Sequence, residues 1–250
     1  FECMSAIEEA IEKYSEDVCA VILESGILGA AGMIPFPDGY LRAVSERCKK
    51  NDVLLILDEV ATGFGRTGKM FGCEHERVSP DLLAMGKGLT GGYLPLAATM
   101  TTKRIYDAFL GDYDEMKQFH HGHTYTGNPI ACAAAIANLE VFEREKVIES
   151  LKEKIEFLEE ELKRFYDLPH VGDVRQKGFM VGIELVKDRE TKERFPMGLR
   201  IGFSVARRAI GKGVFLRPLG DIIVLMPPLS TKIEELKFLC DVVYEGIDKI

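Results

Sequence analysis

The order of apolar and polar positions predicts strands and helices that alternate in the first half of the chain. Four apolar runs have the length of strands, at residues 18–23, 53–57, 82–85 and 94–100. Residues 8–14 and 38–50 instead place apolar side chains at helical spacing. Short runs that are apolar throughout are typical of strands buried on both faces, and strands separated by a helix pair in parallel. This half therefore predicts an α/β fold with a mainly parallel sheet.

Beyond Pro129 the pattern becomes that of helices. Apolar residues recur at intervals of three and four from Ile148 to Phe165, which predicts one long helix. A short coiled coil has the same spacing, but the stretch is under three heptads and Pro169 follows closely, so a helix packed on its own domain is preferred. Strand-like runs then lie at 171–175, 179–186, 214–217 and 222–225, with helices near 198–212 and 232–250.

These patterns predict three parts. Residues 1–135 form the carboxyl-terminal part of a large domain, residues 136–165 a long connecting helix, and residues 166–250 a smaller α/β domain. The chain begins at Phe1, without an initiator Met and within a helical pattern, so we expect an upstream portion.

Composition and charge narrow the possible partners. The 32 basic and 40 acidic residues give a net charge of -8, and no tract is rich in Lys or Arg, which argues against nucleic acid and anionic membranes. No apolar run approaches the roughly 18–20 residues that cross a membrane. Six scattered cysteines without a C-x-x-C pair favour a reducing compartment, and we expect the cytoplasm.

Two charged residues follow apolar strands at the sheet edge where ligands collect. Asp58 ends an all-apolar run, and a carboxylate there is costly to bury without a cation, such as a protonated pyridine nitrogen. Lys87 lies between Gly86 and Gly88, which would let the backbone pass close to a flat ring. Its amine could form a Schiff base with an aldehyde and then act as general base and acid. Singly, a loop contact and a solvated lysine are commoner explanations.

Two other motifs predict different chemistry, and neither is complete. Residues 63–69 have the G-x-x-x-x-G-K spacing of a P-loop, but Met70 stands where a Ser or Thr should bind magnesium. The preceding strand also ends five residues too early. A zinc site could use His120, His121, His123, Cys73 and His75. Adjacent side chains usually diverge, however, and no paired ligand spacing appears, so we expect neither a nucleoside-triphosphatase nor a metal site.

Two long stretches resemble the signature of class III (ω-type) aminotransferases of fold type I. They are DEVATGFGRTG at 58–68 and PDLLAMGKGLTGG at 80–92. HGHTYTGNP at 121–129 and LRPLGD at 216–221, followed by MPP, are similar to the branch of the family that acts in biotin synthesis. The resemblance covers essentially the whole chain. It implies a transaminase dependent on pyridoxal 5'-phosphate, with residues 1–135 belonging to the large cofactor-binding domain.

The resemblance also implies roles for the cofactor site. Lys87 would be the Schiff-base lysine and Asp58 the partner of the pyridinium nitrogen. Thr124 and the backbone of His123 would bind the cofactor phosphate of a neighbouring subunit, so a homodimer would share its active sites. The family's Gly-Ser phosphate cup and stacking aromatic would lie upstream of Phe1.

For the substrates, the resemblance implies that an amino group passes to 8-amino-7-oxononanoate, giving 7,8-diaminononanoate, from S-adenosylmethionine or lysine. Gly122 would lie against the substrate and Arg217 would pair with its carboxylate through two parallel hydrogen bonds. Without the resemblance, a surface salt bridge is the preferred role for Arg217. Leu28 stands where many members have a Gln, which removes a polar contact. Alternatives are an ω-aminotransferase for ornithine, 4-aminobutyrate or a β-amino acid, and a non-catalytic fragment.

Overall fold

The chain divides into two units, each described by itself. The first comprises residues 1–26, 36–64 and 71–145, and the second comprises residues 27–35, 65–70 and 146–250. The computed structural model describes residues 2–14 and 16–250, with side chains from Met4 onward. Phe1 and the side chain of Cys3 lie outside the described residues.

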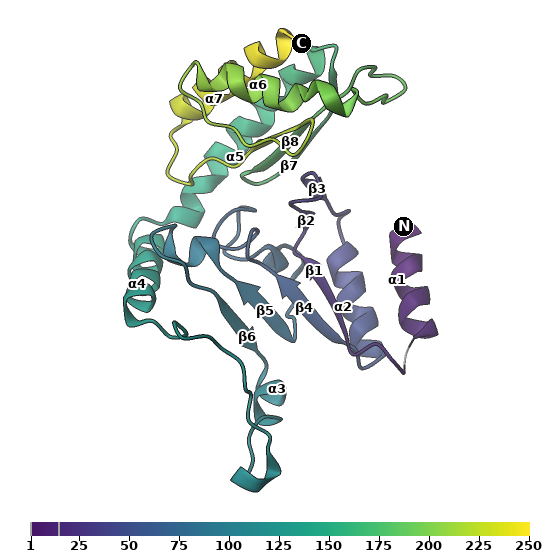
Figure 1. Cartoon of the computed structure of the whole chain (residues 1–250), viewed down its shortest axis with the longest axis vertical. Helices are drawn as coiled ribbons and strands as arrows, with labels where there is room; N and C mark the ends of the chain where they lie inside the picture. Colours follow the sequence, from purple (N-terminus) through teal and green to yellow (C-terminus); the bar gives the residue numbers. More distant parts are fainter. Residues whose placement is uncertain (1, 15) are drawn as a thin grey trace. The chain divides into compact units, whose positions relative to one another are not determined.

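The sheet of the first unit has the predicted strands in the order β1-β4-β5-β6 (Figure 1). Their bounds are Ala20–Glu24, Leu54–Asp58, Leu82–Met85 and Ala98–Thr101. The first three strands are parallel, as predicted, whereas β6 is antiparallel to β5. The link between β5 and β6 contains only a short 3-10 helix, η2 (Lys87–Thr90). A parallel return needs a longer crossover, usually an α-helix, and so the chain turns back antiparallel.

One face of this sheet packs against helices, whereas β4 side chains on the other face are half-buried. The helices are α1 (Glu2–Lys13) and α2 (Tyr40–Lys50). Val44 of α2 is buried in one cluster with Leu55 and Leu57 of β4. Because successive side chains of a strand point to opposite faces, Leu54, Ile56 and Asp58 lie on the other face and are half-buried. Asp58 therefore points away from the apolar core of the first unit.

Beyond β6 the chain forms an arm that leaves the sheet and returns to α4 (Pro129–Arg144) (Figure 1). The arm, residues 102–128, contains α3 (Lys103–Asp107) and η3 (Tyr113–Glu115). Exposed aromatic side chains are spread along it, namely Tyr106, Phe109, Tyr113, Phe119 and Tyr125. Only local contacts such as the edge-to-face pair of Phe109 and Phe119, 5.0 Å between centroids, order these rings among the described residues.

The second unit packs helices on an antiparallel sheet of order β7-β8-β9. The strands are Val171–Lys177, Met180–Leu185 and Ile222–Leu225, and the helices are α5 (Val147–Lys163), α6 (Ile201–Ile210) and α7 (Ile233–Asp248). The short strands β2 (Ile27–Leu28) and β3 (Ile34–Pro35) form a hairpin that also belongs to this unit. Its cluster of Ile27, Met33 and Met180 joins the hairpin to β8.

The strand predicted at residues 214–217 is not formed. Within the described residues, that segment has no ladder, and pairing is limited to the bridge of Leu219 with Ile222 beside it. Pro218 lacks an N–H, and the tight turn at 219–222 leaves too few residues to extend the pairing along β9.

The helix predicted over residues 136–165 is instead two helices, because α4 ends at Arg144 and α5 begins at Val147. Lys146, between them, has a left-handed φ of 49°. At about 100° per residue, one straight helix would place the buried residues of α5 about 180° from those of α4, so it could not bury both sets. Leu151 and Leu158 of α5 lie in the core of the second unit. Helix α4 therefore belongs to the first unit and α5 to the second.

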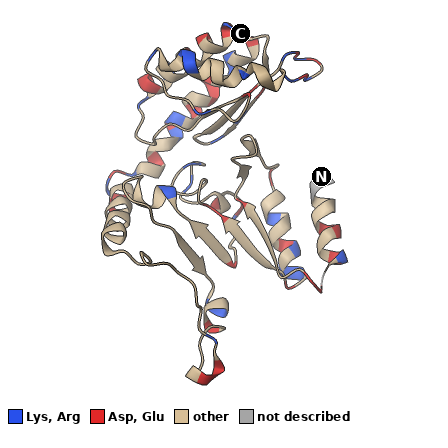
Figure 2. Cartoon of the chain, in the orientation of Figure 1, with Lys and Arg blue, Asp and Glu red and all other residues tan. Residues whose placement is uncertain are grey.

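Charged side chains of both signs lie mainly on helices and loops (Figure 2). No helix in the described part of the chain has the length and apolar character needed to cross a membrane.

Candidate functional site

Asp58 and Lys87 leave neighbouring parallel strands at the same edge of the first unit's sheet. Asp58 is the last residue of β4 and pairs in register with Ala84 of β5. The next residue, Glu59, donates its N–H to the Ala84 carbonyl at 2.8 Å, and Lys87 follows three residues after Ala84. The half-buried Asp58 carboxylate accepts a hydrogen bond from the Val60 N–H at 2.9 Å. The two strand ends are thus adjacent, as the sequence predicts for a parallel sheet.

Lys87 opens η2 in a backbone conformation that is rare for a lysine. Its φ of 41° lies in the left-handed region, and its side chain is exposed. Lys87 lines a pocket of about 940 Å³ together with Val60, Thr90, Leu96 and His123, all from the first unit. Asp58 is not among the described residues that line this pocket. An exposed amine in a partly apolar pocket can react with an aldehyde.

The two glycines beside Lys87 differ in what surrounds them. A Cβ on Gly88 would lie 2.7 Å from the Cβ of Phe64, so Gly88 leaves room for that ring. The space that the sequence argument assigned to a flat cofactor ring is filled here by a phenylalanine. A Cβ on Gly86 would have no heavy atom closer than 3.6 Å. Asn138 of α4 donates to the carbonyls of Gly88 and Leu89 at 2.9 and 3.2 Å, which holds η2 from its other side.

Glu59 is a site residue that the sequence argument missed. It is fully buried, and its carboxylate accepts hydrogen bonds from the Thr62 hydroxyl and from the N–H groups of Gly72 and Cys73, at 2.5, 3.0 and 2.8 Å. Burial and the neighbouring Glu59 carboxylate raise the pKa of the Cys73 thiol to about 12. The signal available in the sequence is an acidic residue directly after Asp58 in an otherwise apolar and small-residue context.

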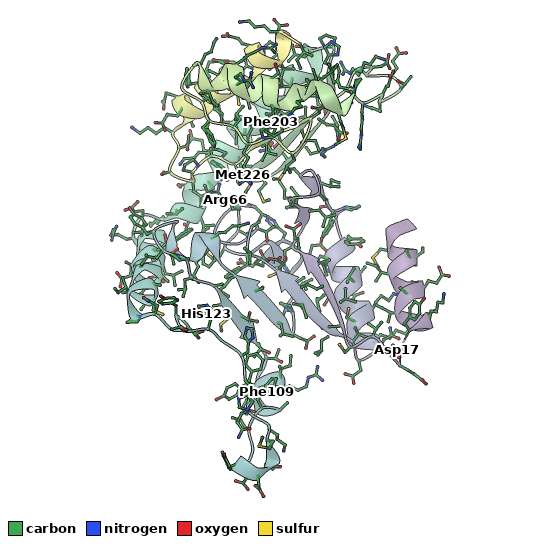
Figure 3. All side chains as sticks on the ribbon, in the orientation of Figure 1. Asp17, Arg66, Phe109, His123, Phe203 and Met226 are labelled. Carbon is green, nitrogen blue, oxygen red and sulfur yellow. The ribbon has the colours of Figure 1, made fainter. Side chains whose placement is uncertain are left out.

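The residues predicted to bind phosphate lie where the arm returns to α4, and Figure 3 labels His123 there. The His123 N–H donates to the Thr126 hydroxyl at 2.9 Å, and the His123 ring accepts the Tyr125 N–H at 3.1 Å. Thr124 is exposed. Gly122 has a left-handed φ of 150°, which favours glycine there.

Helix α4 begins directly after this segment, and its N-terminus is capped from within the chain. The Asn128 side chain accepts hydrogen bonds from the N–H groups of Ile130 and Ala131 at 3.0 and 3.1 Å. The first turn of α4 therefore offers fewer free N–H groups to an anion than an uncapped helix would.

Arg217 lies in the second unit, on the extended segment before β9. It is exposed and lines a groove of about 600 Å³ with Arg200, Arg207, Phe203 and Phe215. Among the described residues of this groove, none is acidic. Phe203, labelled in Figure 3, lies 4.8 Å from the Arg200 guanidinium carbon. Such a groove suits a ligand with an aliphatic chain and a negative charge.

Arg66 is a second charged residue that the sequence argument did not select. It belongs to the second unit and donates to the Pro227 carbonyl at 2.5 Å, next to Met226 (Figure 3). Burial lowers the pKa of its guanidinium. An arginine between Gly65 and Gly68 in the 58–68 stretch is the signal that could have marked it.

The rival motifs lack the geometry of their chemistry. Residues 63–69 run through turns into the 3-10 helix η1 (Gly72–Glu76), so no α-helix presents its N-terminus to a phosphate as in a P-loop. Within residues 4–14 and 16–250, no group of three or more His, Cys, Asp or Glu side chains could hold a metal ion.

Comparison with known proteins gives a consistent result. Residues 2–247 match the class-III aminotransferase family. The chain is 57% identical to adenosylmethionine-8-amino-7-oxononanoate aminotransferases from Methanocaldococcus jannaschii, over 98% of this chain and 54% of that protein, and from Aquifex aeolicus, over 100% and 56%. The crystal structure of the M. jannaschii enzyme matches with a TM-score of 0.97 and 56% identity, over 100% of this chain and 58% of that one. The chain thus spans about half the length of these relatives.

Proposed function

This chain belongs to the class-III aminotransferases, and we propose on that basis that the whole protein transfers an amino group to 8-amino-7-oxononanoate, giving 7,8-diaminononanoate for biotin. The fold is that of a fold type I aminotransferase, and the family depends on pyridoxal 5'-phosphate. The observation that carries the proposal is the position of Asp58 and Lys87 at neighbouring strand ends within the stretch matched to the family.

The residues present fit this cofactor. The Lys87 amine is exposed in a pocket large enough for it and would hold its aldehyde, and the Asp58 carboxylate lies half-buried at the adjacent strand end and would keep its ring nitrogen protonated. When bound, the cofactor supplies an electron sink for the carbanion left by loss of a substrate's α-proton. The Lys87 amine would serve as the base that removes that proton and as the acid that returns one.

The acceptor would be bound by its carboxylate at Arg217. The planar guanidinium can form two parallel hydrogen bonds with a carboxylate, and the apolar side chains beside it suit an aliphatic chain. Gly122 would lie against the substrate. The amino donor would be S-adenosylmethionine or lysine, both small molecules.

We further propose a homodimer in the cytoplasm. The support for the dimer is the row of exposed aromatic side chains on the arm, of which Tyr125 is 72% exposed. A monomer seldom exposes so many large apolar rings in one segment, so a partner surface would cover them. Thr124 and the His123 backbone, in the same segment, would reach the cofactor phosphate of the partner subunit. Sedimentation of the full-length protein tests this, and a monomer at micromolar concentration would refute the shared site.

The test of the cofactor assignment is the visible absorbance of a lysine-bound cofactor in the full-length protein. We expect Lys87→Ala to abolish this band, because no other lysine lines the pocket in the described part of the chain. Lys103→Ala, at an exposed lysine paired with Asp107, should keep the band. A wild-type protein without the band, or a Lys87→Ala protein that retains it, would remove the assignment.

The substrate assignment is tested at Arg217. We expect Arg217→Ala to raise the KM for 8-amino-7-oxononanoate by about 10- to 100-fold, the value of a charge-assisted pair, with the cofactor absorbance unchanged. Arg217→Lys should recover only part of the lost affinity for this substrate, since a lysine cannot form two parallel hydrogen bonds with a carboxylate. Turnover of ornithine, 4-aminobutyrate or a β-amino acid in preference would favour the alternative ω-aminotransferases instead.

A further inference from the structure

The Glu59 carboxylate is the most completely enclosed acidic group of the first unit's site. It is 0% exposed, and each of its oxygens accepts at least one hydrogen bond. Burying a carboxylate costs free energy unless hydrogen bonds satisfy its oxygens, and the loss of one donor adds to that cost. The bonds of Glu59 therefore constrain the segments that donate them.

Those donors lie at the two ends of one loop. Thr62 precedes the loop residues 65–70, and Gly72 and Cys73 follow them at the start of η1. The Glu59 main chain is bound as well, because its carbonyl accepts the Gly63 N–H at 2.9 Å and its N–H binds Ala84 of β5. One residue thus ties the end of β4 to β5 and to both ends of the loop.

Phe64 lies between the two ends that Glu59 joins. It is 3% exposed, has a left-handed φ of 55°, and packs edge-to-face on Phe71 with 5.5 Å between ring centroids. On its other side it is so close to Gly88 that a Cβ there would lie 2.7 Å from it. The place of Phe64 therefore limits the backbone of η2, which carries Lys87.

We propose that Glu59 is a positioning residue, which fixes Phe64 beneath Gly88 and so keeps Lys87 in the left-handed conformation from which its amine reaches the pocket. The inference deepens the proposed function, on which the role of Lys87 rests. Among the described residues, the side-chain hydrogen bonds of Glu59 go to Thr62, Gly72 and Cys73 and not to η2, so Glu59 acts through Phe64. We therefore expect Glu59 to limit the mobility of η2 even before any cofactor binds.

The test uses the full-length protein freed of cofactor, with three readouts. We expect Glu59→Gln to raise amide hydrogen exchange of Leu89 and Gly91, whose N–H groups bind the Gly86 and Gly88 carbonyls, by about tenfold or more. The rate at which Lys87 is labelled by an aldehyde and borohydride should change by a similar factor. After cofactor is restored, kcat should fall by about 10- to 100-fold while KM changes by less than about threefold.

Matched variants separate positioning from general stability. Val44→Ala removes core volume on the covered face of the sheet, and should lower the melting temperature without changing exchange at Leu89 and Gly91. Thr62→Val removes one donor to Glu59 and should reproduce a smaller version of the Glu59→Gln effect. Thr62→Ser keeps the hydroxyl, so its exchange and labelling should be those of the wild-type protein. If the Glu59→Gln protein does not fold, the comparison of Thr62→Val with Thr62→Ser tests the proposal instead.

The outcomes distinguish this inference from the proposed function. Unchanged exchange and unchanged Lys87 labelling in the Glu59→Gln or Thr62→Val protein would overturn the positioning role, whatever the enzyme's activity. Both readouts are made without cofactor. A wild-type protein that lacks the cofactor absorbance but shows the predicted changes would instead refute the proposed function and leave the control of η2 by Glu59 standing.

Discussion

At the scale of single residues, the site holds two side-chain-bearing residues in an unfavourable backbone region. Lys87 and Phe64 have φ values of 41° and 55°, and the left-handed region costs a residue with a Cβ on the order of 1 kcal/mol or more. Both conformations persist because neighbours determine them, Phe64 through Phe71 and Gly88, and η2 through Asn138. The lysine is thus held by packing rather than by its own preference.

The glycines beside Lys87 provide a matched pair of substitutions. We expect Gly88→Ala to destabilise the protein by about 1–3 kcal/mol, because its Cβ would overlap Phe64, and to weaken the absorbance of the lysine-bound cofactor. Gly86→Ala should change the free energy of unfolding by less than about 0.5 kcal/mol, since its Cβ meets nothing within 3.6 Å. Denaturant titration of both variants checks this, and equal losses would contradict the packing argument.

At the scale of elements, one arginine attaches the β2–β3 hairpin to the sheet of the second unit. The Arg175 guanidinium, on β7, donates to the carbonyls of Gly32 and Met33 at 2.9 and 3.1 Å. It also pairs with Asp173 at 3.0 Å and with Glu184 of β8. Only 14% of its side chain is exposed, so these bonds lie in a region with little water. A hairpin of two-residue strands has little stability of its own and depends on this attachment.

We expect Arg175→Ala to destabilise the second unit by about 2–4 kcal/mol, because two carboxylates and two carbonyls lose a shared donor. Arg175→Lys should recover the charge but not the bonds to both carbonyls. Arg144→Ala is the control, since its pair with Glu145 is 66% and 58% exposed and should contribute little. Calorimetry gives the stability, and hydrogen exchange of residues 27–35 locates the loss. Unchanged exchange there would contradict the attachment.

At the scale of the whole molecule, each unit has its own apolar core, and both cores enclose thiols. Cys48 in the core of the first unit is one of them, and burial and the Asp81 carboxylate raise its pKa. Cys73 lies in the core of the first unit and Cys240 in that of the second. Burial, with the nearby Glu59 or Glu161 carboxylate, raises the pKa of each of these last two thiols from 9.0 to about 12. The unfolded chain would release these protons at lower pH than the folded one. Stability is therefore fully present below about pH 9 and falls as the pH rises towards 12.

The expected result is a melting temperature that declines above about pH 9, and less steeply in the Cys73→Ala, Cys240→Ala double variant than in the parent. Cys19→Ser, at an exposed thiol, should leave the slope of the parent unchanged. Calorimetry across this pH range makes the comparison. If the double variant and the parent decline equally, other groups account for the alkaline loss.

Much of the fold and part of the site follow from the sequence, for identifiable reasons. Apolar runs located β5 and β9 to the residue, because strand length and burial are local properties of the chain. Parallel pairing then places Asp58 and Lys87 at one sheet edge, since both follow neighbouring strands. The class-III resemblance rests on contiguous stretches and is confirmed by the family match over residues 2–247. The roles of the site residues stay predictions, namely those of Asp58, Lys87, Gly122, His123, Thr124 and Arg217.

Other features depend on residues distant in the chain, and only the tertiary structure decided them. Local spacing could not locate the break at residues 145–146, because both halves of the 136–165 stretch have a helical pattern. The two helices differ in the face that is buried, and that depends on the core against which each one packs. Likewise, Gly88 makes room for Phe64, Glu59 closes a loop 13 and 14 residues away, and Arg175 binds a hairpin more than 140 residues earlier. Local patterns of polarity specify which elements form, whereas contacts that close long stretches of chain specify how those elements hold the site.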